Sequence, residues 1–245
     1  MNNQPGFDGN LKQFMNRLFN LGLKRGEVPP GSPGSFQHEA WIRRMLKEKA
    51  SRRADLQTRL EDVLFIVLDT ETTGFRPEHG DQIFSVAAAR IQNRSVIGEF
   101  RSLINPGIEI PKEISLLTGI TTKDVKEAPA LDEKAEEILG FLSGGIVIGY
   151  HISHDYAFLN HYLWRRYRSS LKQPALELAL LTERLTGEGP FPSLDSAADY
   201  FNIPCQNRHQ ADADVKIMSS LLMNLLRLCI EKGIETLEDL YIHIK

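Results

Sequence analysis

The chain has 245 residues, of which 42% are hydrophobic and 25% charged, enough for one substantial buried core and an appended segment. No stretch approaches the roughly 18 consecutive apolar residues of a membrane span, and the polar start does not resemble a signal peptide, so we expect a cytoplasmic protein with no membrane contact. Two cysteines, Cys205 and Cys229, are too few for a disulfide framework and lack metal-site spacing.

Charge is divided unevenly along the chain. Residues 1–60 carry 11 basic and 5 acidic side chains, a net charge of +6, whereas residues 61–245 carry 18 basic and 27 acidic ones, a net charge of −9. Affinity for nucleic acid comes largely from Lys and Arg that neutralise phosphates, so the acidic body is not typical of a simple phosphate-binding module. If the body acts on nucleic acid, metal ions must offset its carboxylates.

The first sixty residues predict a basic helical arm rather than a domain. Apolar residues recur at helical spacing from Leu11 to Phe19, the Pro/Gly-rich linker at 26–35 interrupts regular structure, and residues 39–60 resume as a charged helix. An apolar helical stripe usually packs on its own protein, which is the interpretation we favour; binding of a partner or of nucleic acid is the alternative.

From Val63 the pattern changes to that of an α/β domain, which we place at residues 61–245. The apolar run VLFIVLDTETTGF predicts a buried central strand. Gln82–Ile91 and Ser95–Ile104 predict an antiparallel hairpin, because only three residues separate these two strand-like runs.

Helices and strands alternate after the hairpin. We expect helices at 111–117, 132–142, 156–168, 193–201 and 211–231, a strand at 145–150, and a strand or helix at 175–181. Three strands in a meander followed by alternating elements predict an α/β fold with a mixed sheet flanked by helices.

The first chemical motif is Asp69-Thr70-Glu71 at the end of the first strand. Alternation along a strand puts the two carboxylates on the same side. They repel each other unless one is protonated or a cation lies between them, and a site of oxygen ligands favours Mg²⁺ or Mn²⁺ over zinc. A polar turn after a strand is the plainer alternative.

Two further motifs lie at predicted helix starts. Asp155 follows the strand at 145–150, where a carboxylate can simply stabilise a helix N-terminus. His209 and Asp214 are five positions apart around the start of the last helix. On a continuous helix, two residues five positions apart point in directions that differ by about 140°. The side chains of His209 and Asp214 therefore converge only if His209 precedes the first turn. Asp212, between them, needs no role beyond the helix dipole.

In this order the three motifs resemble those of the DEDDh (DnaQ-like) 3′→5′ exonuclease superfamily: Asp-x-Glu on the first strand, an Asp opening a middle helix, and a His with an Asp five residues on. The resemblance runs from about Val63 to Leu226 and extends to the segments 117–121 and 193–198. It implies a ribonuclease H-like fold with a mixed five-stranded sheet. Within the superfamily, the chain is similar to the epsilon proofreading type of bacterial DNA polymerase III.

The resemblance also implies roles for individual residues. Four carboxylates would hold two divalent cations, Mg²⁺ or Mn²⁺, namely Asp69, Glu71, Asp155 and Asp214. His209 would be the general base for the attacking water. The terminal nucleotide would lie against Thr72, Leu117, Thr118 and Ile120. Arg165, Arg166 and Arg168 are candidates for contacts to backbone phosphates and, equally, for a solvated helix face.

The chain departs from the family pattern at two places. Relatives commonly read His-Asn-x-x-Phe-Asp up to the second acid, whereas residues 150–155 here read Tyr-His-Ile-Ser-His-Asp, so the substrate contacts near Asp155 are less defined than the metal site. An Asp-Thr pair is often found where this chain has Leu176-Glu177-Leu178. We expect that change to be structural.

Three functions are open at this point. We favour removal of nucleoside 5′-monophosphates from the 3′ ends of single-stranded DNA in proofreading or repair, because the appended arm suggests a DNA polymerase or repair protein as partner. The alternatives are an RNA 3′-end trimming enzyme similar to ribonuclease T, and a catalytically silent binding module. All five catalytic positions are filled, which argues against the silent module.

Overall fold

A computed structural model of the chain describes residues 39, 40, 42, 43, 46 and 55–245. The predicted helix near residues 11–19 and the linker at 26–35 lie outside this part. Residues Ile42–Lys245 form one compact unit, in which Arg43 Nε donates to the carbonyl oxygen of Tyr167 at 3.0 Å. The boundary of the arm at residue 60 stays a prediction.

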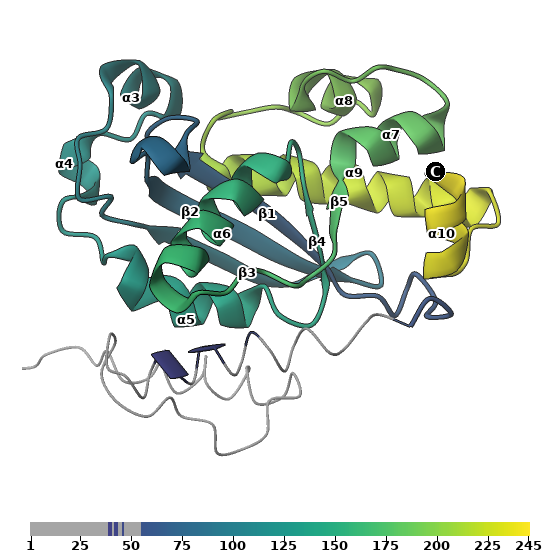
Figure 1. The fold of residues 1–245 in the computed structure, drawn as a ribbon. Helices are drawn as coiled ribbons and strands as arrows, with labels where there is room; N and C mark the ends of the chain where they lie inside the picture. Colours follow the sequence, from purple (N-terminus) through teal and green to yellow (C-terminus); the bar gives the residue numbers. More distant parts are fainter. Residues whose placement is uncertain (1–38, 41, 44–45, 47–54) are drawn as a thin grey trace, which may run out of the picture. The chain divides into compact units, whose positions relative to one another are not determined.

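Five strands form one mixed sheet with the order β3-β2-β1-β4-β5 (Figure 1). The strands are β1 (Phe65–Thr72), β2 (Ile83–Gln92), β3 (Ser95–Leu103), β4 (Ile146–Gly149) and β5 (Ala175–Glu177). The first three pair antiparallel, whereas β4 runs parallel to β1 and β5 parallel to β4. The predicted hairpin and the mixed five-stranded sheet are therefore confirmed.

The helices expected after the hairpin are present in the expected order. From residue 55 on, the helices are η1 (Pro77–His79), α3 (Lys112–Thr118), α4 (Thr122–Val125), α5 (Leu131–Phe141), α6 (Ser153–Tyr167), α7 (Leu178–Thr186), α8 (Leu194–Tyr200), α9 (Ala211–Glu231) and α10 (Leu237–His243). Of these, η1, α4 and α10 were not expected. The ambiguous run at 175–181 contains both β5 and the start of α7. No helix in the described part of the chain is long and apolar enough to cross a bilayer.

Two predicted boundaries were wrong. The middle helix α6 begins at Ser153 rather than at 156, so Asp155 lies inside its first turn. The charged helix expected to reach residue 60 does not do so, because residues 55–62 form turns. Leu60 is buried there and its amide donates to the carbonyl of Glu235 at 2.8 Å, which ties this segment to the C-terminal end of the fold.

Helices cover both faces of the sheet and meet at one end of β1. The long helix α9 packs on β1 and β2, against the face that carries Phe65 and Val67. Figure 1 shows α6 in front of the strands, and this helix contacts β1 and η1. Because β1 is apolar on both faces until Leu68, it is held between the two layers, and its polar end lies between the starts of α6 and α9.

Candidate active site

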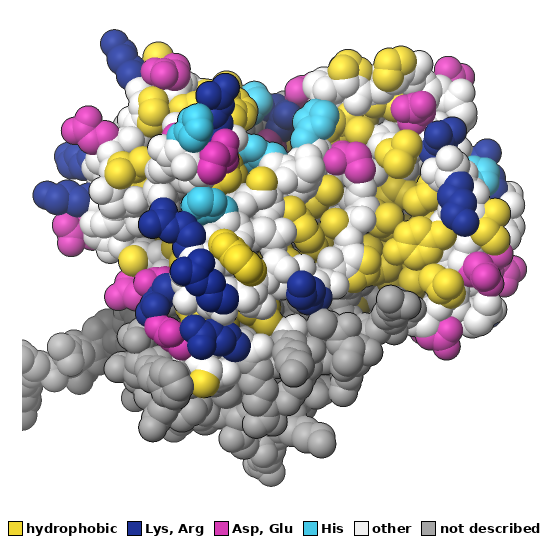
Figure 2. Space-filling model, in the orientation of Figure 1, with side chains coloured by type: hydrophobic (Ala, Val, Ile, Leu, Met, Phe, Trp, Pro, Cys, Tyr) yellow, Lys and Arg dark blue, Asp and Glu magenta, His cyan; other side chains and the backbone are white. Residues whose placement is uncertain are grey.

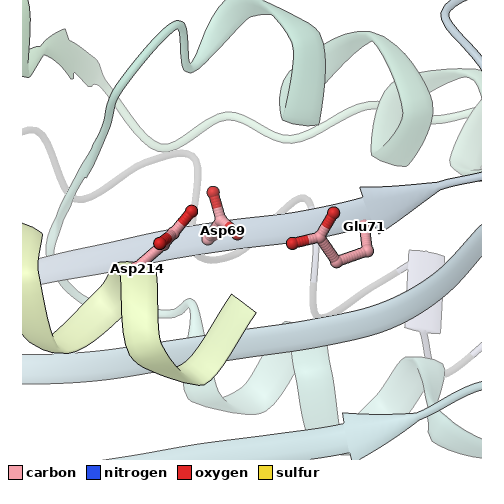
Figure 3. Close-up of side chains that lie close together, drawn as sticks. All are labelled: Asp69, Glu71 and Asp214. Atoms are coloured by element: carbon pink, nitrogen blue, oxygen red, sulfur yellow. The ribbon is translucent and has the colours of Figure 1, made fainter. Parts of the chain in front are cut away.

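Three carboxylates meet where β1 ends. One oxygen each from Asp69, Glu71 and Asp214 lie within 4.8 Å of one another. Figure 3 shows Asp69 and Glu71 projecting from β1 toward Asp214, which comes from the first turn of α9. Alternation along the strand accounts for the shared side of the first two, and the register of β1 against β2 shifts immediately afterwards, between Glu71 and Thr72.

Asp214 has the environment of a metal ligand. Its side chain is buried, and Oδ2 is paired with Arg208 Nη1. Its other oxygen, Oδ1, is also buried and has no hydrogen-bond partner among the described residues. A buried carboxylate oxygen without a donor is costly, so a cation between Asp214 and its two neighbours fits the residues present.

Asp155 reaches the same end of the sheet from the other face. Thr70 Oγ1 donates to Asp155 Oδ1 at 2.6 Å, and Asp155 is buried. The close approach depends on Gly149 at the end of β4, where an added Cβ would lie 3.0 Å from the Leu68 carbonyl oxygen and 2.7 Å from Ile152 Cδ1. Asp155 is thus held as a fourth carboxylate beside the cluster of three.

Burial and mutual repulsion change the protonation of these groups. Burial raises the pKa of Asp69 well above its ordinary value, and the charges of Asp155 and Glu71 raise it further. Burial, followed by the charge of Asp214, raises the pKa of Glu71 to about 8. The pKa of Asp155 rises to about 7 through burial, against the opposing hydrogen bond from Thr70. Without cations, these carboxyl groups therefore retain protons near neutral pH.

His209 lies before the last helix. It has a left-handed backbone with φ of 62°, two residues ahead of the α9 start at Ala211, which is the placement that convergence with Asp214 requires. Its backbone amide donates to Asp214 Oδ2 at 3.3 Å. Asp212 is different, because it pairs with Arg101 at 2.9 Å outside the carboxylate cluster.

Arg208 is a site residue that the sequence reasoning missed. Its Nε donates to Asp195 Oδ1 at 2.9 Å, and its Nη1 pairs with Asp214. The guanidinium therefore connects α8 to the first turn of α9 and places a positive charge against the cluster. Nothing in the local pattern distinguishes this arginine from a surface one, since both partners are fixed only by the fold.

The segment before Asp155 is fixed by Glu177. Glu177 Oε1 accepts from the amide of His151 at 2.8 Å and Oε2 accepts from the amide of Ile152 at 3.1 Å. The same side chain caps α7 by accepting from the amide of Ala179 at 3.3 Å. These bonds agree with the structural role expected for Glu177.

His154, which replaces the Phe of the family pattern named in the sequence analysis, packs as an aromatic residue. Its ring centroid lies 5.8 Å from that of Phe75 and 4.9 Å from that of Phe158. Its Nε2 lies 3.1 Å from Thr72 Oγ1, which itself donates to the Gly74 carbonyl at 2.7 Å, so Nε2 is the donor in this contact. Burial lowers the pKa of His154, which favours the neutral ring.

The predicted nucleotide contacts around α3 divide into exposed and buried side chains. Leu117 is 51% exposed, whereas Thr118 is 2% exposed and donates through Oγ1 to the Ile114 carbonyl at 2.9 Å. Ile120 packs inward against a small apolar cluster that contains Phe84. Thr118 and Ile120 therefore fix the turn after α3, and Leu117 is the side chain of the three that faces solvent.

The turn after α3 lies close to the segment that contains His209 and Gln210. Gly119 ends α3 with φ of 73°, and a Cβ added there would lie 3.6 Å from Gln210 Nε2, in the residue before α9. Two exposed apolar side chains near this end of the sheet were not singled out from the sequence: Leu116 is 77% exposed and Phe75 is 81% exposed.

Residues 66–222 match the model of a protein family described as Exonuclease. This chain belongs to that family. The matched residues include the four carboxylates and His209, and the membership confirms the resemblance to DnaQ-like exonucleases that the three motifs predicted.

Similar proteins include several that are named as DNA polymerase III or as its epsilon subunit. A DNA polymerase III subunit epsilon-like protein of Rhodobacter capsulatus is 34% identical over 188 residues, which cover 74% of this chain and 26% of that protein. The DNA polymerase III subunit epsilon of Aquifex aeolicus is 28% identical over 171 residues, 70% of this chain and 84% of that protein. A PolC-type DNA polymerase III of Thermotoga petrophila is 27% identical over 193 residues, and the matched part is 14% of its length.

Solved exonuclease structures share the fold. Exonuclease X in complex with 5′ overhanging duplex DNA has a TM-score of 0.56 at 18% identity, covering 74% of this chain and 99% of that one. E. coli Exonuclease I in complex with a dT13 oligonucleotide has a TM-score of 0.59 at 20% identity, covering 70% and 43%. The nuclease domain of 3′hExo, a DEDDh family member bound to rAMP, has a TM-score of 0.55 at 16% identity, covering 71% and 94%. The predicted ribonuclease H-like fold is confirmed.

Proposed function

We propose that this chain is a metal-dependent 3′→5′ exonuclease that removes nucleoside 5′-monophosphates from the 3′ ends of single-stranded DNA in proofreading or repair. The observation that carries the proposal is the meeting of Asp69, Glu71 and Asp214 within 4.8 Å, beside the buried Asp155. Membership of the exonuclease family supports the reaction, and the names of the polymerase III relatives support DNA as substrate.

The four carboxylates would hold two Mg²⁺ or Mn²⁺ ions. The buried Oδ1 of Asp214, for which the described part of the chain supplies no donor, fits this role. Bound cations would lower the pKa of the attacking water and stabilise the leaving 3′-oxygen. His209, held next to Asp214 by its backbone amide, would accept the proton of that water, because histidine is the side chain that most often serves as a general base.

The terminal nucleotide would lie between the end of β1 and the turn after α3. Leu117 offers an exposed apolar surface for the base. The backbone around Thr72, where β1 ends, would contact the same nucleotide. Thr118 and Ile120 would act by holding that turn in place, since their side chains are turned toward the protein.

A DNA polymerase or repair protein is the proposed partner of residues 1–60, and the cytoplasm is the proposed location. The net charge of +6 on this segment and the polymerase III relatives support a role in such an assembly. A chain beginning at Ile42 should keep hydrolysis of a short oligonucleotide and lose affinity for the cognate polymerase. Equal affinity of the two chains would exclude residues 1–41 and move the contact to residues 42–245, which keep seven of the eleven basic residues of the arm.

The decisive test is degradation of matched 5′-labelled DNA and RNA oligonucleotides with Mg²⁺, Mn²⁺ or EDTA. We expect stepwise shortening of DNA from the 3′ end that requires a divalent cation and is lost in Asp214→Ala. Asp212→Ala is the matched control, because it removes a carboxylate from the same helical turn that pairs with Arg101 instead of joining the cluster. Preferential degradation of RNA would show that RNA, and not DNA, is the substrate. Cleavage of neither oligonucleotide would favour a catalytically silent binding module.

A further inference from the structure

The outer face of α6 is basic and aromatic. α6 begins beside the site at Asp155, and the 1.5 Å rise per residue puts Arg165 about 15 Å further along the helix. Trp164 is 59% exposed, and the guanidinium of Arg168 lies 5.9 Å from its ring centroid. Figure 2 shows Lys and Arg side chains gathered over the C-terminal half of α6, around a hydrophobic side chain.

A groove runs beside this face, between α6 and the segment from η1 to β2. Its cavity volume is about 340 Å³. From α6 it is lined by two aromatic residues and by cationic or polar ones, namely Phe158, Tyr162, His161, Arg165 and Arg166. The groove thus combines apolar ring surface with positive charge, which is the combination that single-stranded nucleic acid requires.

The carboxylates near the groove are already engaged. Asp132 pairs with Arg166 at 3.4 Å and accepts from the Tyr162 hydroxyl at 2.7 Å. Asp81 accepts from the amide of Arg76 at 2.9 Å. Within residues 55–245, no carboxylate pairs with the exposed guanidinium groups of Arg165 and Arg168. These two cations are therefore available to an external anion.

The groove is continuous with the proposed active site. Phe158 lines the groove, and its ring lies 4.9 Å from that of His154. His154 in turn contacts Thr72, the residue that follows Glu71. A strand whose 3′ end lies at the carboxylates and whose upstream part enters this groove would pass along α6.

We propose that this groove and the outer face of α6 bind the single strand upstream of the hydrolysed bond, with phosphates on Arg165 and Arg168 and a base stacked on Trp164. The inference rests on the proposed function and adds the path of its substrate. The contacts lie within roughly four nucleotides of the 3′ end, since the phosphates of one strand are at least about 3.4 Å apart along the helix axis. Such contacts position the strand without reading its sequence.

The test measures binding separately from hydrolysis. Fluorescence anisotropy of 5′-labelled dT12 and dT2 in EDTA gives the affinity of the full chain without turnover, and KM for dT12 with Mg²⁺ is measured in parallel. The variants are R165Q/R168Q and W164A. The control is R227Q/K232Q, which removes two exposed charges at the far end of α9.

We expect R165Q/R168Q to weaken dT12 binding roughly tenfold and to reduce the slope of log affinity against log salt by about 1.4, the value for two phosphate contacts on a single strand. W164A should weaken dT12 binding roughly tenfold with an unchanged salt slope. Binding of dT2 should stay the same in all variants. If R165Q/R168Q binds dT12 with the same affinity and salt slope as the R227Q/K232Q control, the proposal that the strand passes along α6 is wrong. Failure of the wild-type chain to hydrolyse DNA that it binds would instead overturn the proposed function.

Discussion

The carboxylate cluster at the end of β1 and the basic face of α6 are opposite in charge and in burial. The cluster carboxyls are shielded from water, so their charge is costly and protons or cations must neutralise it. Arg165 and Arg168 are exposed, so water solvates their charge and no desolvation penalty arises. The comparison teaches that carboxylates shielded from water need a cation to neutralise them. Exposed arginines need no such partner and can bind a polyanion. α6 belongs to both, since it starts at the cluster and ends in the basic face.

The largest effect is expected from removing one of the two β1 carboxylates of the cluster. Glu71→Ala or Asp69→Ala should lower kcat/KM by roughly 10³-fold or more, because metal-assisted stabilisation of several kcal/mol is lost. The free energy of unfolding should not fall, since each substitution relieves repulsion between closely spaced carboxylates. Initial rates and urea unfolding curves check the two statements, and either variant with near wild-type turnover would remove the cluster from catalysis.

A smaller loss is expected from the residue that orients the fourth carboxylate. Thr70→Val keeps the shape of the side chain but removes the donor to Asp155 Oδ1, and support of this kind is worth roughly 10- to 100-fold in metal affinity or activity. Thr70→Ser retains the hydroxyl and is the matched control. Titration of activity against Mg²⁺ measures the effect, and equal curves for Val and Ser would show that Asp155 needs no donor.

A several-fold effect is expected on the substrate side. Leu117→Ala should raise KM for short DNA about fivefold with little change in kcat, because it removes part of the exposed apolar surface that we propose contacts the terminal base without reacting. Leu180→Ala on α7 is the control, as that leucine is also exposed but lies on another helix. If the two variants gave the same KM, the base contact would belong elsewhere.

The smallest effect concerns stability and pH in the metal-free protein. The folded-state pKa of Glu71 is about 8 against an ordinary value of 4.5, so the folded state binds more protons than the unfolded state between these values. Protonation of Glu71 therefore stabilises the folded state relative to the unfolded state. This contribution is complete below about pH 4.5 and is lost as pH rises through about 8. Thermal unfolding in EDTA should show a midpoint that falls from pH 5 to pH 8, and Mg²⁺ should reverse the fall. Glu71→Gln should flatten the slope, and a wild-type midpoint that rises with pH contradicts this account.

Much of the fold was predictable because its signals are local. The apolar run before Asp69 identified β1, and the apolar periodicity after Gln210 gave the α9 boundaries that the structure has. Three short helices were missed, and two of them carry a start signal, Thr121 with Asp124 for α4 and Thr236 with Asp239 for α10. Their few residues leave no room for a periodic pattern, so the capping box was the signal to use.

The supporting contacts of the site were not predictable in the same way. Thr70 and Asp155 are 85 positions apart, and Arg208 meets Asp195 only after α8 has packed beside α9. The sequence also could not separate Leu117 from Thr118, because in a helix of seven residues it does not tell which side faces inward. Such details depend on packing between distant segments, which periodicity does not record.

The long helix α9 connects the site to the whole core. Asp214 is in its first turn, and the positions that follow pack their apolar side chains into the main core as far as Cys229. Amide hydrogens in this helix should therefore exchange with solvent only at the rate set by global opening, whereas those of the irregular segment before it, including His209, should exchange through local fluctuations. On warming, the segment that contains His209 would therefore loosen before the first turn of α9 releases Asp214.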